Sequence, residues 1–182
     1  VADKLNAHVL LKGAVTVIVP PSHSGAPIVS QTAGPAWLAT AALIVKLPNA
    51  LDAQLQADEG LSLFEYMALA VLSEQEDRSM QMSDLAAATS ASLSRLSHGV
   101  KRLERQGYLT RERVPGAGRR TRAILTDEGY SKVVGAAPNH VRRVRELLID
   151  AVSDQQLCQL REIGETVLAQ VDDVPPGAGW GV

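Results

Sequence analysis

Residues 92–125 read SLSRLSHGVKRLERQGYLTRERVPGAGRRTRAIL, and this stretch decides the fold. Apolar residues recur at helical spacing in its first half, after Ser92, a typical N-cap, and before Gly107, a typical helix end. The second half predicts two strands, 108–114 and 119–125, joined by a Pro-Gly-Ala-Gly loop. The stretch therefore predicts a helix reaching Gln106, followed directly by a β-hairpin.

Two shorter helices precede this unit. Ser62 and Glu65 form a capping box that predicts a helix reaching about Glu74, and a short helix is predicted over 83–88. Helix, helix and hairpin in this order predict a winged helix-turn-helix over 61–126. The fold class is therefore mainly α with a small β-hairpin wing, within the α+β winged helices.

Longer helices flank the winged helix. We expect residues 36–60 and 127–171 to form a helical dimerisation region. The last helix begins at a capping box, Ser153 to Gln156, and a heptad-like seam along it indicates a partner helix from a second copy: Leu157, Leu160, Gly164, Val167 and Val171. Residues 1–35 are interpreted as an N-terminal extension or linker with a short strand at 15–19. Residues 172–182 are expected to be a disordered tail.

Charge is segregated along the chain. Between Arg95 and Arg122 there are nine Lys or Arg residues and two acids, a local charge of +7, whereas the remainder carries 9 basic and 18 acidic residues, or −9. A basic helix and hairpin on an acidic body indicate a surface that docks on phosphates. The alternative is a solvated charged face, which explains most charge runs.

Other classes of protein are disfavoured by what the sequence lacks. A single cysteine, Cys158, excludes an internal disulfide framework and a Cys-rich metal site, and the four His are scattered without metal-ligand spacing. No apolar run approaches the roughly 18 residues of a membrane span. We find no Gly-rich phosphate loop, acid/base pair or nucleophile motif, so we expect neither an enzyme nor a bound cofactor. These features predict a cytoplasmic protein.

Three motifs resemble those of the MarR family, the dimeric winged-helix transcription regulators. They are Leu85-Ala86, the run Leu103-Glu104-Arg105-Gln106-Gly107-Tyr108-Leu109, and Leu125-Thr126-Asp127-Glu128-Gly129, and the resemblance covers about 37–171. One position departs from the pattern. The family carries Asp-x-Arg at the wing tip, where this chain has Ala117-Gly118-Arg119. We expect Ala117→Asp to tighten DNA binding.

The resemblance implies that residues 92–101 form the helix that enters the major groove. Arg95, in the first helical turn, is expected to pair with a guanine, and Arg119 to enter the minor groove. For Ser92 we favour capping, and His98 is as well explained as an exposed bystander. The full set of predicted DNA-binding residues is Ser92, Ser94, Arg95, Ser97, His98, Lys101, Arg102, Arg113, Arg119 and Arg120.

The family also binds small, often aromatic or phenolic, molecules between the dimer helices and the winged-helix core. Trp37, Tyr66 and Met67 are candidates to line such a pocket, although core or dimer packing explains each of them as well. The leading hypothesis is a homodimeric repressor that binds a palindromic operator in double-stranded DNA and is released by a small ligand. The alternative is a winged-helix module for protein interaction, with weak or no specific DNA binding.

Overall fold

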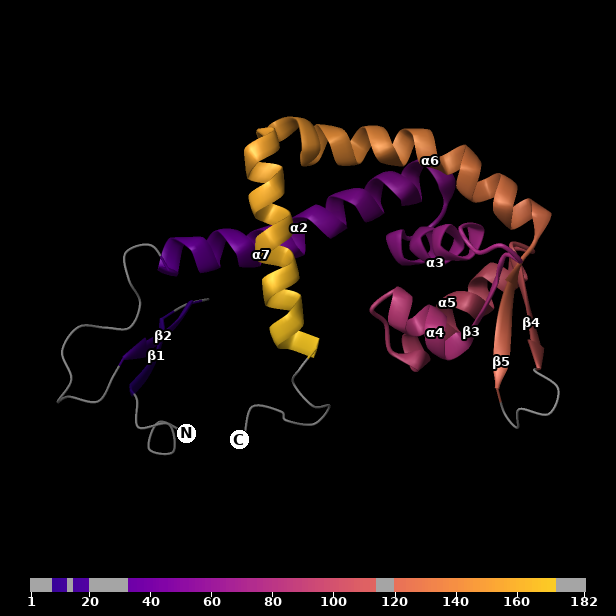
Figure 1. Cartoon of the computed structure of the whole chain (residues 1–182), viewed down its shortest axis with the longest axis horizontal. Helices are drawn as coiled ribbons and strands as arrows, with labels where there is room; N and C mark the ends of the chain where they lie inside the picture. Colours follow the sequence, from indigo (N-terminus) through magenta and orange to yellow (C-terminus); the bar gives the residue numbers. More distant parts are fainter. Residues whose placement is uncertain (1–7, 13–14, 20–32, 114–119, 173–182) are drawn as a thin grey trace. The chain divides into compact units, whose positions relative to one another are not determined.

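The computed structural model describes residues 8–12, 15–19, 33–113 and 120–172 (Figure 1). The chain divides into two compact units. One comprises Leu47–Ala151, and the other comprises the two ends, Val1–Lys46 and Val152–Val182. These two units are defined by which residues contact one another. The predicted domains were defined by function instead, as a winged helix and a dimerisation region. Their boundaries therefore stay predictions.

The unit of residues 47–151 is a winged helix-turn-helix followed by a long helix. Its sheet is antiparallel with strand order β3-β5-β4, and β4 and β5 form the hairpin of the wing. The mainly helical fold with a small wing is therefore confirmed. Its elements are α3 (Leu63–Ser73), β3 (Ser79–Gln81), α4 (Met82–Ala88), α5 (Leu93–Arg105), β4 (Leu109–Arg113), β5 (Thr121–Leu125), α6 (Asp127–Leu147) and the 3₁₀ helix η1 (Ile149–Ala151).

Side chains at the helix starts fix the boundaries. The Ser62 hydroxyl accepts from the Glu65 backbone N–H at 3.2 Å, and the Glu65 carboxylate accepts from the Ser62 N–H at 2.9 Å. This is the predicted capping box of α3. Ser92 caps α5 in the same way as Thr126 caps α6, each hydroxyl accepting a backbone N–H three residues ahead.

The core of this unit is mostly leucine and alanine, drawn from helices and sheet alike. Since the side chains come from α3, α4, α5, the hairpin and α6, the core fixes the orientation of α5 and of the wing base together. Its buried members are Leu61, Ala68, Leu69, Leu72, Leu85, Ala86, Leu96, Val100, Leu103, Leu109, Ala123, Leu125 and Val133.

The strand β3 was not predicted. It is only three residues long, and its partner is β5, where Ser79 pairs with Ile124 and Gln81 with Arg122. A segment this short has no measurable alternation of polar and apolar residues, so its strand conformation comes from pairing across the sheet.

In the unit of the two chain ends, β1 (His8–Lys12) pairs antiparallel with β2 (Val15–Val19). The strand predicted at 15–19 is confirmed, whereas β1 was not predicted. The helix α2 (Ala33–Glu59) begins in this unit and ends at Gly60, which has a φ of +67°. The helix α7 (Asp154–Asp172) completes the unit.

Candidate nucleic-acid interface

The helix α5 is held in place by one apolar stripe. Leu96, Val100 and Leu103 are all fully buried in the core. The Ser92 hydroxyl accepts from the Arg95 N–H at 3.2 Å, so the capping role that we favoured for Ser92 is confirmed. The remaining surface of α5 divides into an outward face and two flanks.

The outward face lies opposite the buried stripe. Its residues are spaced by four, three and four, which places them on one side of a helix, and all are exposed: Ser94, His98, Lys101 and Arg105. Arg105 is absent from the predicted set. Its position could have been read from the sequence, since it lies four residues beyond Lys101. The outward face therefore carries two cations and two hydrogen-bonding side chains.

The first flank faces α3 and carries two arginines with partners inside the protein. The Arg95 guanidinium lies over the Phe64 ring, 5.1 Å from its centroid. Arg102 makes two contacts with Glu65, Nε to Oε1 at 2.9 Å and a second N–H donating to Oε2 at 3.1 Å. Glu65 is only 1% exposed. Arg102 thus joins α5 to the capping box of α3, a contact that the sequence did not predict.

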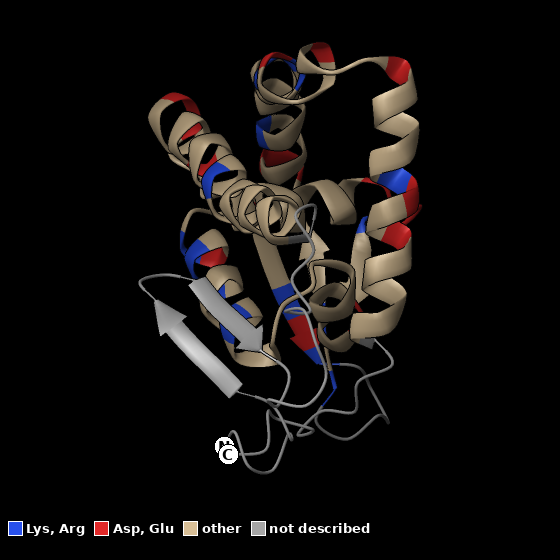
Figure 2. Ribbon diagram, turned by 90° about the vertical axis from the view of Figure 1, so that its left-hand side faces the viewer, with Lys and Arg blue, Asp and Glu red and all other residues tan. Residues whose placement is uncertain are grey.

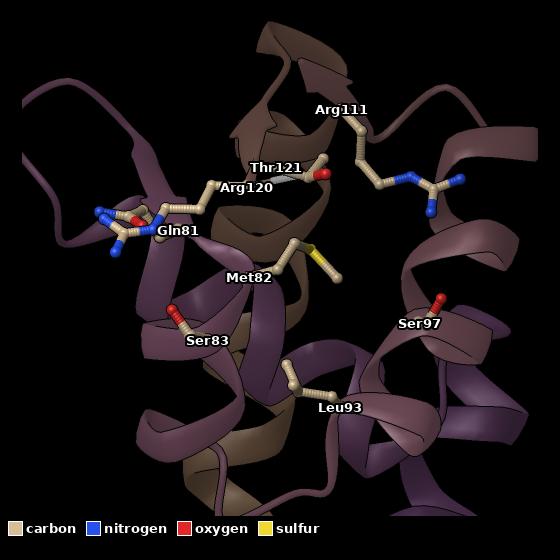
Figure 3. A pocket seen from close by; sticks show the side chains of 8 residues that line it. All are labelled: Gln81, Met82, Ser83, Leu93, Ser97, Arg111, Arg120 and Thr121. Carbon is tan, nitrogen blue, oxygen red and sulfur yellow. The ribbon is translucent and has the colours of Figure 1, made fainter. Parts of the chain in front are cut away.

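The second flank faces the wing. Leu93 and Ser97 border an open hollow of about 340 Å³, together with residues of β3, α4 and the hairpin (Figure 3). Met82 and Ser83 line it from the start of α4, and Thr121 from β5. In this view Met82 lies at the centre with Leu93 below it, and the hydroxyl groups of Ser83 and Ser97 lie on either side. Arg111, Arg120 and Thr121 lie above them.

The two faces of the hairpin make different contacts. Leu109 and Leu125 are buried cross-strand partners on one face, and the pairs Arg111–Ala123 and Arg113–Thr121 share that face. Arg111 forms an ion pair with Glu104 of α5. Blue and red segments alternate along a strand of the hairpin in Figure 2. Arg113 extends the same face beyond Arg111 and is exposed.

Arg122 lies on the opposite face of the hairpin. Its guanidinium is 3.3 Å from a carboxylate oxygen of Asp77. Hydrogen bonds from Ser79, with a smaller contribution from the positive charge of Arg122, lower the pKa of Asp77. Because alternate residues of a strand point to opposite faces, Arg122 and Arg113 cannot face the same partner. Arg120 precedes β5, is exposed and borders the hollow. Arg119 and Ala117 lie outside the described residues.

Of the three residues proposed for a ligand pocket, Met67 and Tyr66 lie in different surroundings within the unit of residues 47–151. Met67 borders a second hollow, of about 650 Å³, beside Arg95, His98 and Arg102. Tyr66 instead packs against His140, with ring centroids 4.5 Å apart, and burial raises the pKa of Tyr66 and lowers that of His140. Trp37 belongs to the unit of the chain ends and is 58% exposed.

The described residues hold neither a cluster of metal ligands nor a membrane-spanning helix. No group of three or more His, Cys, Asp or Glu side chains there could hold a metal ion. None of the described helices is both long enough and apolar enough to cross a membrane.

Three helices, α3, α4 and α5, followed by the β4–β5 hairpin on the same core, place the chain in the class of winged helix-turn-helix proteins. Within that class, residues 59–120 match the model of the MarR family. The chain is 35% identical to Sco3205, a MarR family transcriptional regulator from Streptomyces coelicolor whose crystal structure is in complex with DNA. That match covers 82% of this chain and 94% of Sco3205, with a TM-score of 0.78.

Two further structures extend the comparison. AbsC, a MarR family transcriptional regulator from Streptomyces coelicolor, is 33% identical, with 81% of this chain and 99% of AbsC covered and a TM-score of 0.75. A MarR family transcriptional regulator from Silicibacter pomeroyi is 29% identical, with 75% and 93% covered and a TM-score of 0.60. No match was found among curated proteins.

The chain therefore belongs to the MarR family of transcriptional regulators. The resemblance inferred from the three motifs is confirmed, as is the expectation of a transcription regulator rather than an enzyme.

Proposed function

We propose that this regulator binds double-stranded DNA sequence-specifically, with α5 in the major groove and the wing on the neighbouring minor groove. The observation that carries the proposal is the outward face of α5, where Lys101 and Arg105 share one exposed side with Ser94 and His98. The related Sco3205 was crystallised in complex with DNA, which supports this proposal. Because such a regulator must reach chromosomal DNA, we also propose a cytoplasmic location.

The residues of the interface have different roles in this proposal. Lys101 and Arg105 contact phosphates, while Ser94, Ser97 and His98 reach base edges. Arg113, Arg119 and Arg120 hold the wing on the DNA backbone and in the minor groove. Arg95 reads a guanine by leaving the Phe64 ring, which is an exposed and weak attachment. Arg102 acts as a positioning residue, because its contacts with Glu65 fix the angle of α5.

A homodimer is the second part of the proposal. Exposed apolar side chains recur along α7, at Ile163, Val167 and Val171, each between 54% and 60% exposed. Trp37 and Ile44 on α2 are exposed to a similar degree. Stripes of this kind favour a partner helix, and a second copy is the simplest one. Two copies of α5 would then read the two halves of a palindromic operator, as a repressor does.

Release by a small effector is the third part. The hollow beside Met67 is lined by the first turn of α3 and by one flank of α5. An aromatic or phenolic molecule with an acidic group would meet Arg95 and Arg102 there. By competing with Glu65 for Arg102, it would loosen the contact that fixes α5 and so change the fit of the helix to its groove.

Fluorescence anisotropy tests DNA binding directly, on the DNA upstream of the protein's own gene and on a scrambled duplex at several salt concentrations. We expect tighter, salt-dependent binding to the upstream DNA. Arg105→Ala should reduce the slope of log affinity against log salt by about one. Arg122→Ala is the matched control, since Arg122 lies on the other face of the hairpin with Asp77. Equal, weak binding to both duplexes would instead favour the protein-interaction module.

A further inference from the structure

Leu93 is an exception among the apolar residues of α5. Leu96, Val100 and Leu103 are fully buried, whereas Leu93, the first residue of the helix, is 58% exposed. Among the described residues of α4, α5 and the hairpin, Leu93 is the one large apolar residue that is exposed to solvent. With 58% of its surface exposed, Leu93 presents apolar surface at this interface that a bound partner can cover.

The neighbours of Leu93 indicate what kind of partner this surface fits. Its side chain and that of Met82 extend into the same open hollow, with the Ser97 hydroxyl at one side (Figure 3). Ser97 lies four residues after Leu93, so the two share one flank of the helix. Ser92 completes the helix cap without Leu93, because its hydroxyl already accepts from Arg95. Neither the core nor the cap therefore accounts for a leucine here.

The major groove offers an apolar side chain a single kind of partner. Of the four bases, only thymine presents a methyl group there, at C5, and the other groups that distinguish the base pairs are hydrogen-bond donors and acceptors. The first turn of a recognition helix is the part that reaches base edges. A leucine at this position, next to a hydroxyl four residues on, matches a thymine methyl beside a hydrogen-bonding base edge.

We propose that Leu93 is a specificity-determining residue that selects a thymine in each half of the operator by packing against its C5-methyl group. This inference rests on the proposed DNA-binding function and adds the chemistry by which one base is chosen. Met82 borders the same hollow and shields the methyl group from water on the side of α4.

The test replaces single thymines with deoxyuridine, which lacks only the C5-methyl group. The probe is a duplex that the full chain selects from a pool of random duplexes, and affinity is measured by fluorescence anisotropy. In each half-site, replacing one particular thymine should lower the affinity of the wild-type protein for the duplex about fourfold. This is the loss expected for one buried methyl group. Leu93→Ala should bind more weakly and show no loss at that thymine.

Two further variants separate this role from others. Leu93→Met keeps an apolar side chain and should keep most of the loss on deoxyuridine substitution. Ser94→Ala changes a neighbour on the outward face and should keep all of it. Thermal unfolding checks that each variant is folded, which the exposure of Leu93 leads us to expect.

The outcomes distinguish the inference from the function on which it rests. If the wild-type protein binds its selected duplex specifically but no deoxyuridine position weakens binding, or Leu93→Ala retains the loss, the role of Leu93 is overturned while DNA binding stands. If the wild-type protein enriches no sequence from the pool, both are overturned. Loss of the deoxyuridine effect in Leu93→Ala alone establishes the contact.

Discussion

The helices α5 and α7 differ in the burial of their apolar residues. Three apolar residues of α5 are completely buried in the core of the winged helix, whereas α7 buries none of its residues from 154 to 171. The helix α5 is thus specified within its own unit, by a core that the single chain completes. The apolar stripe of α7 has no such core among the described residues, and in the proposed homodimer a partner helix covers it. The burial of α5 thus specifies the fold of one unit, whereas the exposure of α7 supports the proposed homodimer.

The largest expected effect contrasts a leucine from each helix. Leu103→Ala should lower the free energy of unfolding by about 2–5 kcal/mol, because it leaves a cavity in the core of the winged helix. Leu168→Ala, at a site 59% exposed, should cost less than about 0.5 kcal/mol in the monomer. Thermal unfolding at several protein concentrations measures both. The loss for Leu103→Ala should not depend on concentration, and that for Leu168→Ala should grow with it. Equal losses at every concentration would remove the contrast.

A charge placed on α7 should disrupt the proposed homodimer without unfolding the helix. Val167→Asp should weaken the proposed dimer at least about 100-fold, roughly 3 kcal/mol, because a carboxylate would be desolvated against an apolar partner. Sedimentation velocity at micromolar concentration gives the oligomeric state, and circular dichroism gives the helical content. A variant that stays dimeric would move the interface away from this side of α7.

Much of the fold could be predicted from the sequence because its signals are local. The capping box at Ser62 and Glu65, the N-cap at Ser92 and the glycine at Gly107 each act within a few residues. They therefore fixed the helices and the hairpin without knowledge of the rest of the chain. The strand β3 could not be predicted, since its conformation comes from pairing with β5 more than forty residues later in the chain.

The candidate site divides in the same manner. Helical spacing alone places Lys101 and His98 on an exposed face, and it also places Arg105 there, although that residue was not proposed. Spacing cannot reveal that Arg102 is bound to Glu65, 37 residues away, or that Arg95 lies over Phe64. Nor can it show that Tyr66 packs against His140. Each of these contacts joins two elements and depends on how they pack.

The next prediction concerns the ion pair between Arg102 and Glu65, in the unit of residues 47–151. Arg102→Ala should lower the free energy of unfolding by about 2 kcal/mol, because it leaves the buried carboxylate of Glu65 without its cationic partner, although Ser62 still donates to it. The figure is below that for a fully buried pair, since the Arg102 side chain is 51% exposed. Chemical denaturation measures the loss. The double variant with Glu65→Gln should recover part of it, and strictly additive losses would show that the two side chains do not depend on each other.

The smallest effect concerns His140, a polar group in the same unit. Its Nδ1 atom is buried without a hydrogen-bond partner among the described residues, and burial lowers the pKa of the imidazole. The unfolded chain therefore binds a proton more readily than the folded one, and stability falls as the pH drops below the ordinary histidine value of about 6.5. His140→Gln should remove this dependence. As the pH falls from about 7 to about 5, the Tm of the wild type should therefore drop further than the Tm of the variant. A difference that stays constant over this range would mean that His140 takes up a proton equally well in the folded protein.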